Sequence, residues 1–115
     1  MFDTTTFDNA DLRPVLVIGP TRTTTARELI DAIVTASSGT ITVARRLDAI
    51  TDAVVHPSTS KFVGVLDTAD LSIREDLRGL LSEARRAGVQ LIILARTAKS
   101  VPADLRPYMR EVVAA

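Results

Sequence analysis

The chain has 115 residues, and its 14 Lys and Arg balance 14 Asp and Glu, so its formal net charge at pH 7 is zero. This length fits one domain, and the charge balance argues against nucleic acid as a partner, because such binding depends on neutralising phosphates. The absence of cysteine excludes disulfides, thiolate catalysis and cysteine metal sites. No apolar run approaches the roughly 20 residues that span a bilayer, and the first residues lack the pattern of a signal peptide. We therefore expect no membrane contact and a cytoplasmic location.

The chain begins with a polar and acidic stretch, residues 1–14, which predicts a tail or strap over a single domain formed by residues 15–115. Within that domain, short apolar runs alternate with helical patterns. The apolar runs predict strands at residues 15–18, 40–43, 62–66 and 89–94. The patterns between them predict helices at residues 24–36, 45–55 and 73–84, the last of which is followed by the capping Gly88.

The helical periodicity also predicts which side chains are buried. In the first two helices these are Ala26, Leu29, Ile30, Ile33, Val34, Leu47, Ile50 and Val54. The C-terminal segment fits two structures. Residues 102–106 could open a helix that Pro107 interrupts, and residues 110–114 fit either a last helical turn or an edge strand. We favour the helix.

Apolar strands that alternate with amphipathic helices are typical of a parallel sheet covered on both sides. We therefore predict a single three-layer α/β domain of the P-loop or Rossmann-like kind, with a mainly parallel sheet of four or five strands and helices on both faces. Ligands of such sheets bind at the carboxyl ends of the strands. The loops at residues 19–25, 67–70 and 96–99 should share that edge.

Residues 15–30, VLVIGPTRTTTARELI, have the strand, turn and helix order of a phosphate-binding loop. A working loop has glycine, four residues, glycine, lysine and then serine or threonine, because the glycines let backbone amides approach the phosphates, the lysine reaches them and the hydroxyl holds magnesium. Gly19 fits the first position. Thr24, Thr25 and Ala26 occupy the other three, so the chemical groups of the motif are lost.

A family resemblance follows from two further segments, FVGVLDTADL at residues 62–71 and ARRAGVQLIILAR at residues 84–96. Together with residues 15–30, they resemble FtsK-type and EccC-type motor ATPases, in a chain whose middle part is much shorter. The resemblance places Asp67 at the magnesium-associated aspartate. It places Thr68 at the glutamate that would orient the attacking water, and Arg96 at or next to a glutamine. It implies common ancestry and fold without hydrolysis.

Phosphoryl transfer depends on positioning and charge stabilisation, so we predict no enzyme activity, no bound metal and no cofactor. The vestigial phosphate site would consist of Gly19, Arg22, Thr23, Thr24, Thr25 and Asp67. Arg22 could still offer a charge-assisted contact to a phosphate beside the helix N-terminus. Its simpler interpretation is a solvated loop residue, with Thr23 or Thr24 as the helix N-cap.

The leading functional hypothesis is a protein-protein interaction or regulatory module, whose partner would be another protein such as a P-loop ATPase of similar shape. The alanine-rich composition and the preference for arginine over lysine suit a small actinobacterial or phage accessory protein. Self-association is a further hypothesis, with Tyr108, Val112 and Val113 at the contact.

Two alternatives stay open. One is a sensor that binds a nucleotide or another anion without hydrolysis. The other is a pseudo-receiver signalling domain, in which Asp67 would take the place of the phosphoacceptor and Thr97 or Lys99 would join the site. Receivers hold magnesium with an acidic pair after the first strand, whereas this chain has Gly-Pro-Thr at residues 19–21.

Overall fold

The computed structural model describes residues 13–36, 41–56, 61–69 and 71–114, with the side chains of 71–76 left aside. Most of the predicted tail at residues 1–14 lies outside these ranges. The described elements, in chain order, are β1 (Val15–Ile18), α1 (Arg22–Ala36), β2 (Ile41–Ala44), α2 (Leu47–Val55), β3 (Lys61–Asp67), α3 (Leu71–Ala87), β4 (Gln90–Ala95), the 3₁₀ turns η2 (Ala98–Ser100) and η3 (Arg106–Tyr108), and β5 (Arg110–Val113).

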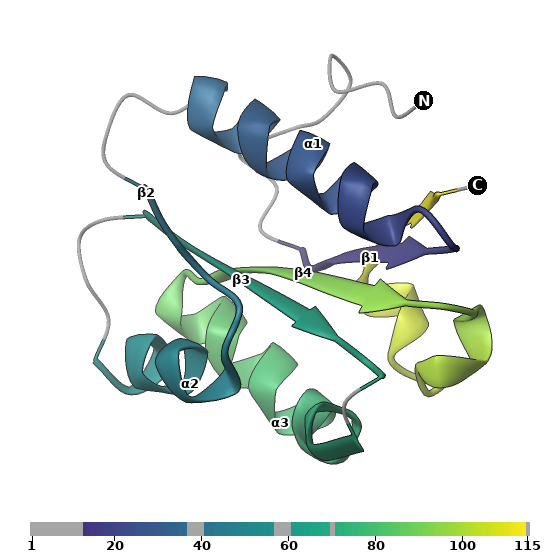
Figure 1. Ribbon diagram of the computed structural model, residues 1–115. Helices are drawn as coiled ribbons and strands as arrows, with labels where there is room; N and C mark the ends of the chain where they lie inside the picture. The colour runs from purple at the N-terminus through teal and green to yellow at the C-terminus, as the bar shows by residue number, and fades with distance from the viewer. Residues whose placement is uncertain (1–12, 37–40, 57–60, 70, 115) are drawn as a thin grey trace.

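The described strands form one five-stranded sheet in the order β2-β3-β4-β1-β5, and every pairing is parallel. Helix α1 covers one face, and α2 and α3 cover the other (Figure 1). All six residues of the central strand β4 are buried. The predicted three-layer α/β domain is therefore confirmed. Among the described residues, we find no helix with the length and apolar character needed to cross a membrane.

Each central strand contributes to two separate cores because successive side chains point to opposite faces of the sheet. Leu16 of β1 belongs to the core shared with α2 and α3, whereas Val15 and Val17 belong to the core under α1. The same alternation places Ile93 of β4 on one side and Ile92 on the other. This two-sided burial explains why β1 and β4 read as uninterrupted apolar runs.

The C-terminal segment corrects our preference for a helix at residues 110–114. Arg110–Val113 forms the edge strand β5, which runs parallel to β1 with Val15 opposite Arg110 and Ile18 opposite Val113. The Arg110 amide donates to the Pro14 carbonyl at 2.8 Å. The segment forms a strand because β1 would otherwise have one row of unpaired backbone groups. The two valines, Val112 and Val113, also favour extended backbone.

Residues 102–106, predicted as a candidate helix start, form no α-helix; residues 103–105 form a turn that leads into η3 at Arg106. The Leu105 amide donates to the Pro102 carbonyl at 3.0 Å, and the Tyr108 amide donates to the Leu105 carbonyl at 3.1 Å. These are single-turn bonds between residues three apart. A longer helix does not form because Pro107 has no amide hydrogen to donate.

Other differences from the prediction concern boundaries and burial. Helix α1 begins at Arg22 rather than residue 24, and α2 begins at Leu47 rather than residue 45. Val34 is exposed near the end of α1, although its spacing placed it on the buried face. Thr40, predicted as the first residue of the second strand, lies outside the described residues.

Two glycines provide a matched test of packing. A Cβ at Gly64 in β3 would lie 2.8 Å from the Ile50 side chain, whereas a Cβ at Gly79 in α3 would meet nothing within 4 Å. We expect Gly64→Ala to destabilise the fold by about 1 kcal/mol through overpacking. Gly79→Ala should stabilise it by about 0.5–1 kcal/mol through helix propensity. Urea unfolding of both variants measures the difference, and equal effects would contradict this packing of α2 on β3.

Candidate functional site

The connection from β1 to α1 is shorter than a phosphate-binding loop. It consists of residues 19–21, and Arg22 already lies in the first turn of α1. Gly19 has φ +134°, and a Cβ there would lie 1.9 Å from the Ala114 carbonyl oxygen. Its amide donates to the Ala95 carbonyl at 3.0 Å. Glycine is therefore required at this position by the close approach of the chain's own backbone.

The threonines that follow are residues of the helix. Thr23 and Thr24 are exposed in the first turn, and Thr25 is buried. The Thr25 amide already donates to the Thr21 carbonyl at 3.1 Å. Ala26, at the position of the magnesium-binding hydroxyl, is buried in the core under α1. The amide of Thr25 and the side chain of Ala26 are thus engaged within the protein.

Arg22 joins the loop after β1 to the end of β3. Its Nε donates to Asp67 Oδ2 at 3.4 Å, and its Nη1 donates to the Gly19 carbonyl at 3.3 Å. The Arg22 side chain is 20% exposed and that of Asp67 is 38% exposed. From the sequence, a solvated Arg22 was the favoured interpretation. In the structure, its side chain is part-buried and pairs with Asp67.

The second oxygen of Asp67 is also engaged. Oδ1 accepts a hydrogen bond from the Ala69 amide at 2.9 Å. Next to it, the buried Thr68 donates both its amide and its hydroxyl to the Leu94 carbonyl, at 2.8 and 3.0 Å. Thr68 therefore fastens the end of β3 to β4. Its hydroxyl is committed to the backbone, so Thr68 serves as a structural group at the position where the sequence resemblance predicted a lost glutamate.

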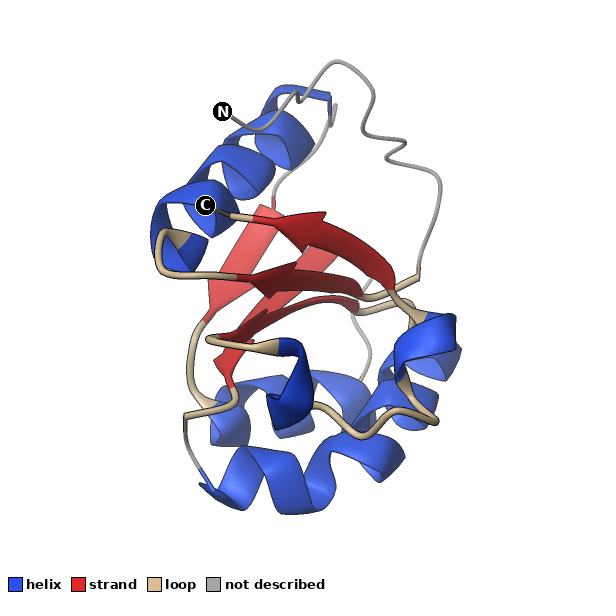
Figure 2. Cartoon of the chain, turned by 90° about the vertical axis from the view of Figure 1, so that its right-hand side faces the viewer, coloured by secondary structure: helices blue, strands red, loops and turns tan. Residues whose placement is uncertain are grey.

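A small cavity of about 220 Å³ lies at this carboxyl edge of the sheet. The predicted convergence of the loops is borne out in part, since the cavity joins Arg22, Asp67 and Arg96 from the ends of β1, β3 and β4. Figure 2 looks onto this side of the molecule. The full lining consists of Arg22, Asp67, Thr68, Ala69, Arg96 and Ser100. With two guanidinium groups and one carboxylate, the cavity has an excess of one positive charge, which can attract an anion.

The other predicted site residues are not part of this cavity. Thr23, Thr24, Thr97 and Lys99 do not line it. Ser100 does line it, and no motif in the sequence points to this serine in a short 3₁₀ turn. Among the described residues, no group of three or more His, Cys, Asp or Glu could hold a metal ion.

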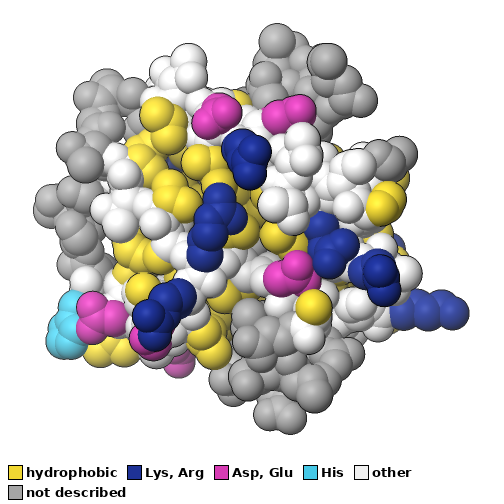
Figure 3. Space-filling view, in the orientation of Figure 1, with side chains coloured by type: hydrophobic (Ala, Val, Ile, Leu, Met, Phe, Trp, Pro, Cys, Tyr) yellow, Lys and Arg dark blue, Asp and Glu magenta, His cyan; other side chains and the backbone are white. Residues whose placement is uncertain are grey.

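The predicted contact residues lie at the β5 edge. Tyr108 is 64% exposed and Val113 is 79% exposed, whereas Val112 is half-buried and packs against the core under α1. At the opposite edge, Figure 3 shows hydrophobic side chains on the face that carries β2. Val34, Val43 and Val55 are the exposed valines of α1, β2 and α2. Both edges of the sheet therefore carry accessible apolar side chains.

Comparison of the chain with protein-family models and with curated proteins gives no match.

The link between Arg22 and Asp67 can be measured by a double-mutant cycle with Arg22→Ala and Asp67→Ala. We expect a coupling free energy of about 0.5–1 kcal/mol, because the pair is only part-buried and solvent screens it. The control is the cycle of Arg46→Ala and Asp48→Ala, whose side chains are 82% and 69% exposed and lie 3.0 Å apart. That coupling should be close to zero. Equal couplings in urea unfolding would contradict a structural role for the Arg22 contact.

Proposed function

We propose that this chain is a protein-protein interaction or regulatory module built on a catalytically inactive P-loop-like domain. The observation that carries the proposal is the contact of Arg22 with both Asp67 and the Gly19 carbonyl. A hydrolase needs cationic groups aimed at the phosphates and a carboxylate open to the metal. Here the candidate cation and the candidate carboxylate neutralise each other.

The absence of hydrolysis is part of this proposal. Thr25 replaces the phosphate-reaching lysine, and it is buried with its amide bonded inside α1. Ala26 replaces the magnesium hydroxyl and is buried as well. The structural demands of α1 account for both residues. A loop of this construction lacks the groups that lower the barrier to phosphoryl transfer.

A function in binding is supported by the surface. Exposed apolar side chains occur at both edges of the sheet, including Tyr108 and Val113 at β5 and Val43 at β2. Edge strands offer unpaired backbone groups, so accessible apolar side chains beside them favour docking. The partner we propose is another protein, with a P-loop ATPase of similar shape as the first candidate because of the family resemblance. The proposed location is the cytoplasm.

One observation favours a second candidate, a sensor that binds an anion without hydrolysing it. The cavity at the carboxyl edge places Arg22 and Arg96 beside a single carboxylate, Asp67. Among the described residues, Arg96 makes no ion pair and is exposed. It could therefore contact a phosphate without first leaving a partner.

The sheet order does not favour the pseudo-receiver alternative. In the flavodoxin-like order 2-1-3-4-5, the first strand lies beside the third. In this chain, β4 lies between β1 and β3. The receiver hypothesis therefore has only the position of Asp67 after β3 in its support.

The two candidates make opposite predictions about nucleotides. For the interaction module, millimolar magnesium-ATP and magnesium-ADP should leave the melting temperature unchanged, because a ligand stabilises only a native state that it binds. A differential scanning experiment with the wild type, Arg22→Ala and Asp67→Ala provides the measurement. A rise in the wild type that Arg22→Ala abolishes would favour the sensor. Turnover of ATP that disappears in Asp67→Ala would contradict the inactive assignment.

Self-association through the β5 edge is tested separately. If Tyr108 and Val113 form such a contact, the mass in sedimentation equilibrium should rise with concentration. Val113→Asp should keep the chain monomeric, because it places a charge in an apolar interface. Thr24→Asp, an exposed substitution in the first turn of α1, is the control and should leave the mass unchanged. A monomeric wild type at high concentration would contradict this part of the proposal.

A further inference from the structure

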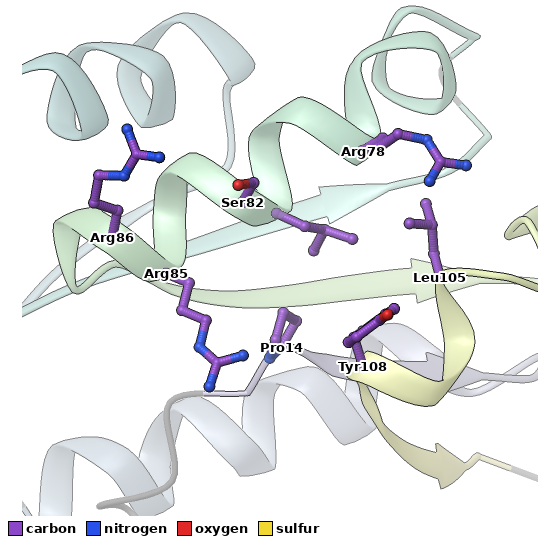
Figure 4. A pocket seen from close by; sticks show the side chains of 8 residues that line it. Pro14, Arg78, Ser82, Arg85, Arg86, Leu105 and Tyr108 are labelled. Atoms are coloured by element: carbon purple, nitrogen blue, oxygen red, sulfur yellow. The ribbon is translucent and has the colours of Figure 1, made fainter.

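A groove of about 450 Å³ lies between α3 and the segment that leads into β5. Figure 4 shows the side chains around it. Arg85 extends from α3 toward Pro14, and Tyr108 lies on the other side of that proline. Leu105 stands opposite α3 near Arg78. The groove is thus formed by three parts of the chain that the sheet brings together.

The inner surface of the groove is apolar. Leu81 from α3 and Leu105 from the turn before η3 are buried members of one core, and Pro14 is buried beside them. Tyr108 adds an exposed aromatic side chain at the outside. A cleft of this volume and lining can take up a bulky apolar side chain.

The rim of the groove is positively charged. Arg78 pairs with Asp104, and the hydrogen bond from Arg78 lowers the pKa of that carboxyl group. Arg85 and Arg86 are exposed, and among the described residues neither makes an ion pair. Asp104 offsets Arg78, and Arg85 extends toward Pro14 without an ion pair, so the rim keeps an excess of positive charge. Arg86 lies farther from Pro14 and also lines a neighbouring cavity with Glu83.

The backbone that carries these two arginines is held in place. Gly88 has φ +75°, its amide donates to the Arg85 carbonyl at 3.3 Å, and the Val89 amide donates to the Ala84 carbonyl at 2.9 Å. This pair of bonds is a Schellman cap, which fixes the end of α3. Arginines in a last helical turn also balance the helix dipole. That role leaves their guanidinium groups available to a partner.

We propose that this groove docks an acidic peptide segment of a partner protein, which inserts one bulky apolar side chain. The inserted side chain would pack on Leu81 and Leu105, and flanking carboxylates would pair with Arg85 and Arg86. Charge complementarity favours an acidic partner, and the apolar lining favours a peptide over a nucleic-acid backbone. The inference rests on the proposed interaction function and adds the chemistry of the partner and the place where it binds.

The test uses the full chain and a phage-displayed library of short random peptides as the probe. We expect selection of peptides that combine Asp or Glu with Phe, Leu or another bulky apolar residue. The most enriched peptide is then synthesised for titration. Arg85→Glu combined with Arg86→Glu should weaken its binding about tenfold or more, because two attractive charge pairs become repulsive. Tyr108→Ser should weaken binding too, and its exposed position spares the fold.

The matched control reverses two exposed arginines elsewhere, with Arg27→Glu combined with Arg45→Glu, and should bind the peptide like the wild type. Arg85→Gln combined with Arg86→Gln removes the charge without adding acids and should show an intermediate loss. Binding should also weaken as salt rises. A selected peptide that lacks acids, or one whose affinity the groove variants leave unchanged, would overturn the groove assignment and leave the interaction function standing.

Two further outcomes decide against the proposal. The chain could self-associate in the absence of peptide. If the double variant Arg85→Glu/Arg86→Glu abolishes that self-association, the groove binds a second copy of this chain. If the library yields no peptide that binds any part of the chain, the result would contradict both the proposed docking groove and the proposed interaction function.

Discussion

The backbone of Ala114 passes so close to Gly19 that a residue with a side chain cannot occupy that position. This approach follows from the pairing of β5 with β1, which continues into the bond from the Ala114 amide to the Ile18 carbonyl at 2.7 Å. It fixes where β1 ends and confines the connection to three residues. Because α1 then begins at Arg22, that side chain reaches Asp67 across the end of β4. The shape of the whole carboxyl edge thus depends on one contact between backbone segments.

The chemical character of that edge follows from the same constraint. A carboxylate at the end of a buried strand needs compensation for its charge, and Asp67 obtains it from Arg22 and from the Ala69 amide. The Thr68 hydroxyl donates its hydrogen bond to the Leu94 carbonyl. Groups that could have served a ligand instead connect β1, β3 and β4. Arg96 at the same edge makes no ion pair among the described residues, and elsewhere the exposed surface carries the apolar sheet edges and the arginine-rimmed groove.

Much of this fold could be predicted from the sequence because strong local patterns specify it. The apolar runs of β1 and β4 are buried on both sides, so their composition alone identifies central parallel strands. The secondary structure of residues 110–113 was harder to predict. Four residues carry little periodicity, and their pairing with β1 joins segments that are far apart in the chain. Val34 is exposed although the adjacent Ile33 is fully buried, so the buried face of α1 is narrower near its end than the spacing of apolar residues predicts. Glycine at position 19 fits the first position of a phosphate loop, and it is also required by the close approach of the Ala114 backbone. No local sequence pattern could show the second reason, because Ala114 is far away in the chain.

The position of β1 between β4 and β5 also bears on how the chain folds during synthesis. Among the described strands, β1 is made first, and it has no strand neighbour in the finished sheet until β4 has been made; its second neighbour, residues 110–113, comes later still. Pairings between segments so far apart in the chain form slowly. In the meantime, α1 is the near neighbour that can shield Val15 and Val17, the side chains of β1 that face it, since α1 and β1 are joined by only three residues. The three-residue connection, which keeps α1 beside β1, would therefore reduce the exposure of apolar side chains to aggregation until the sheet can close.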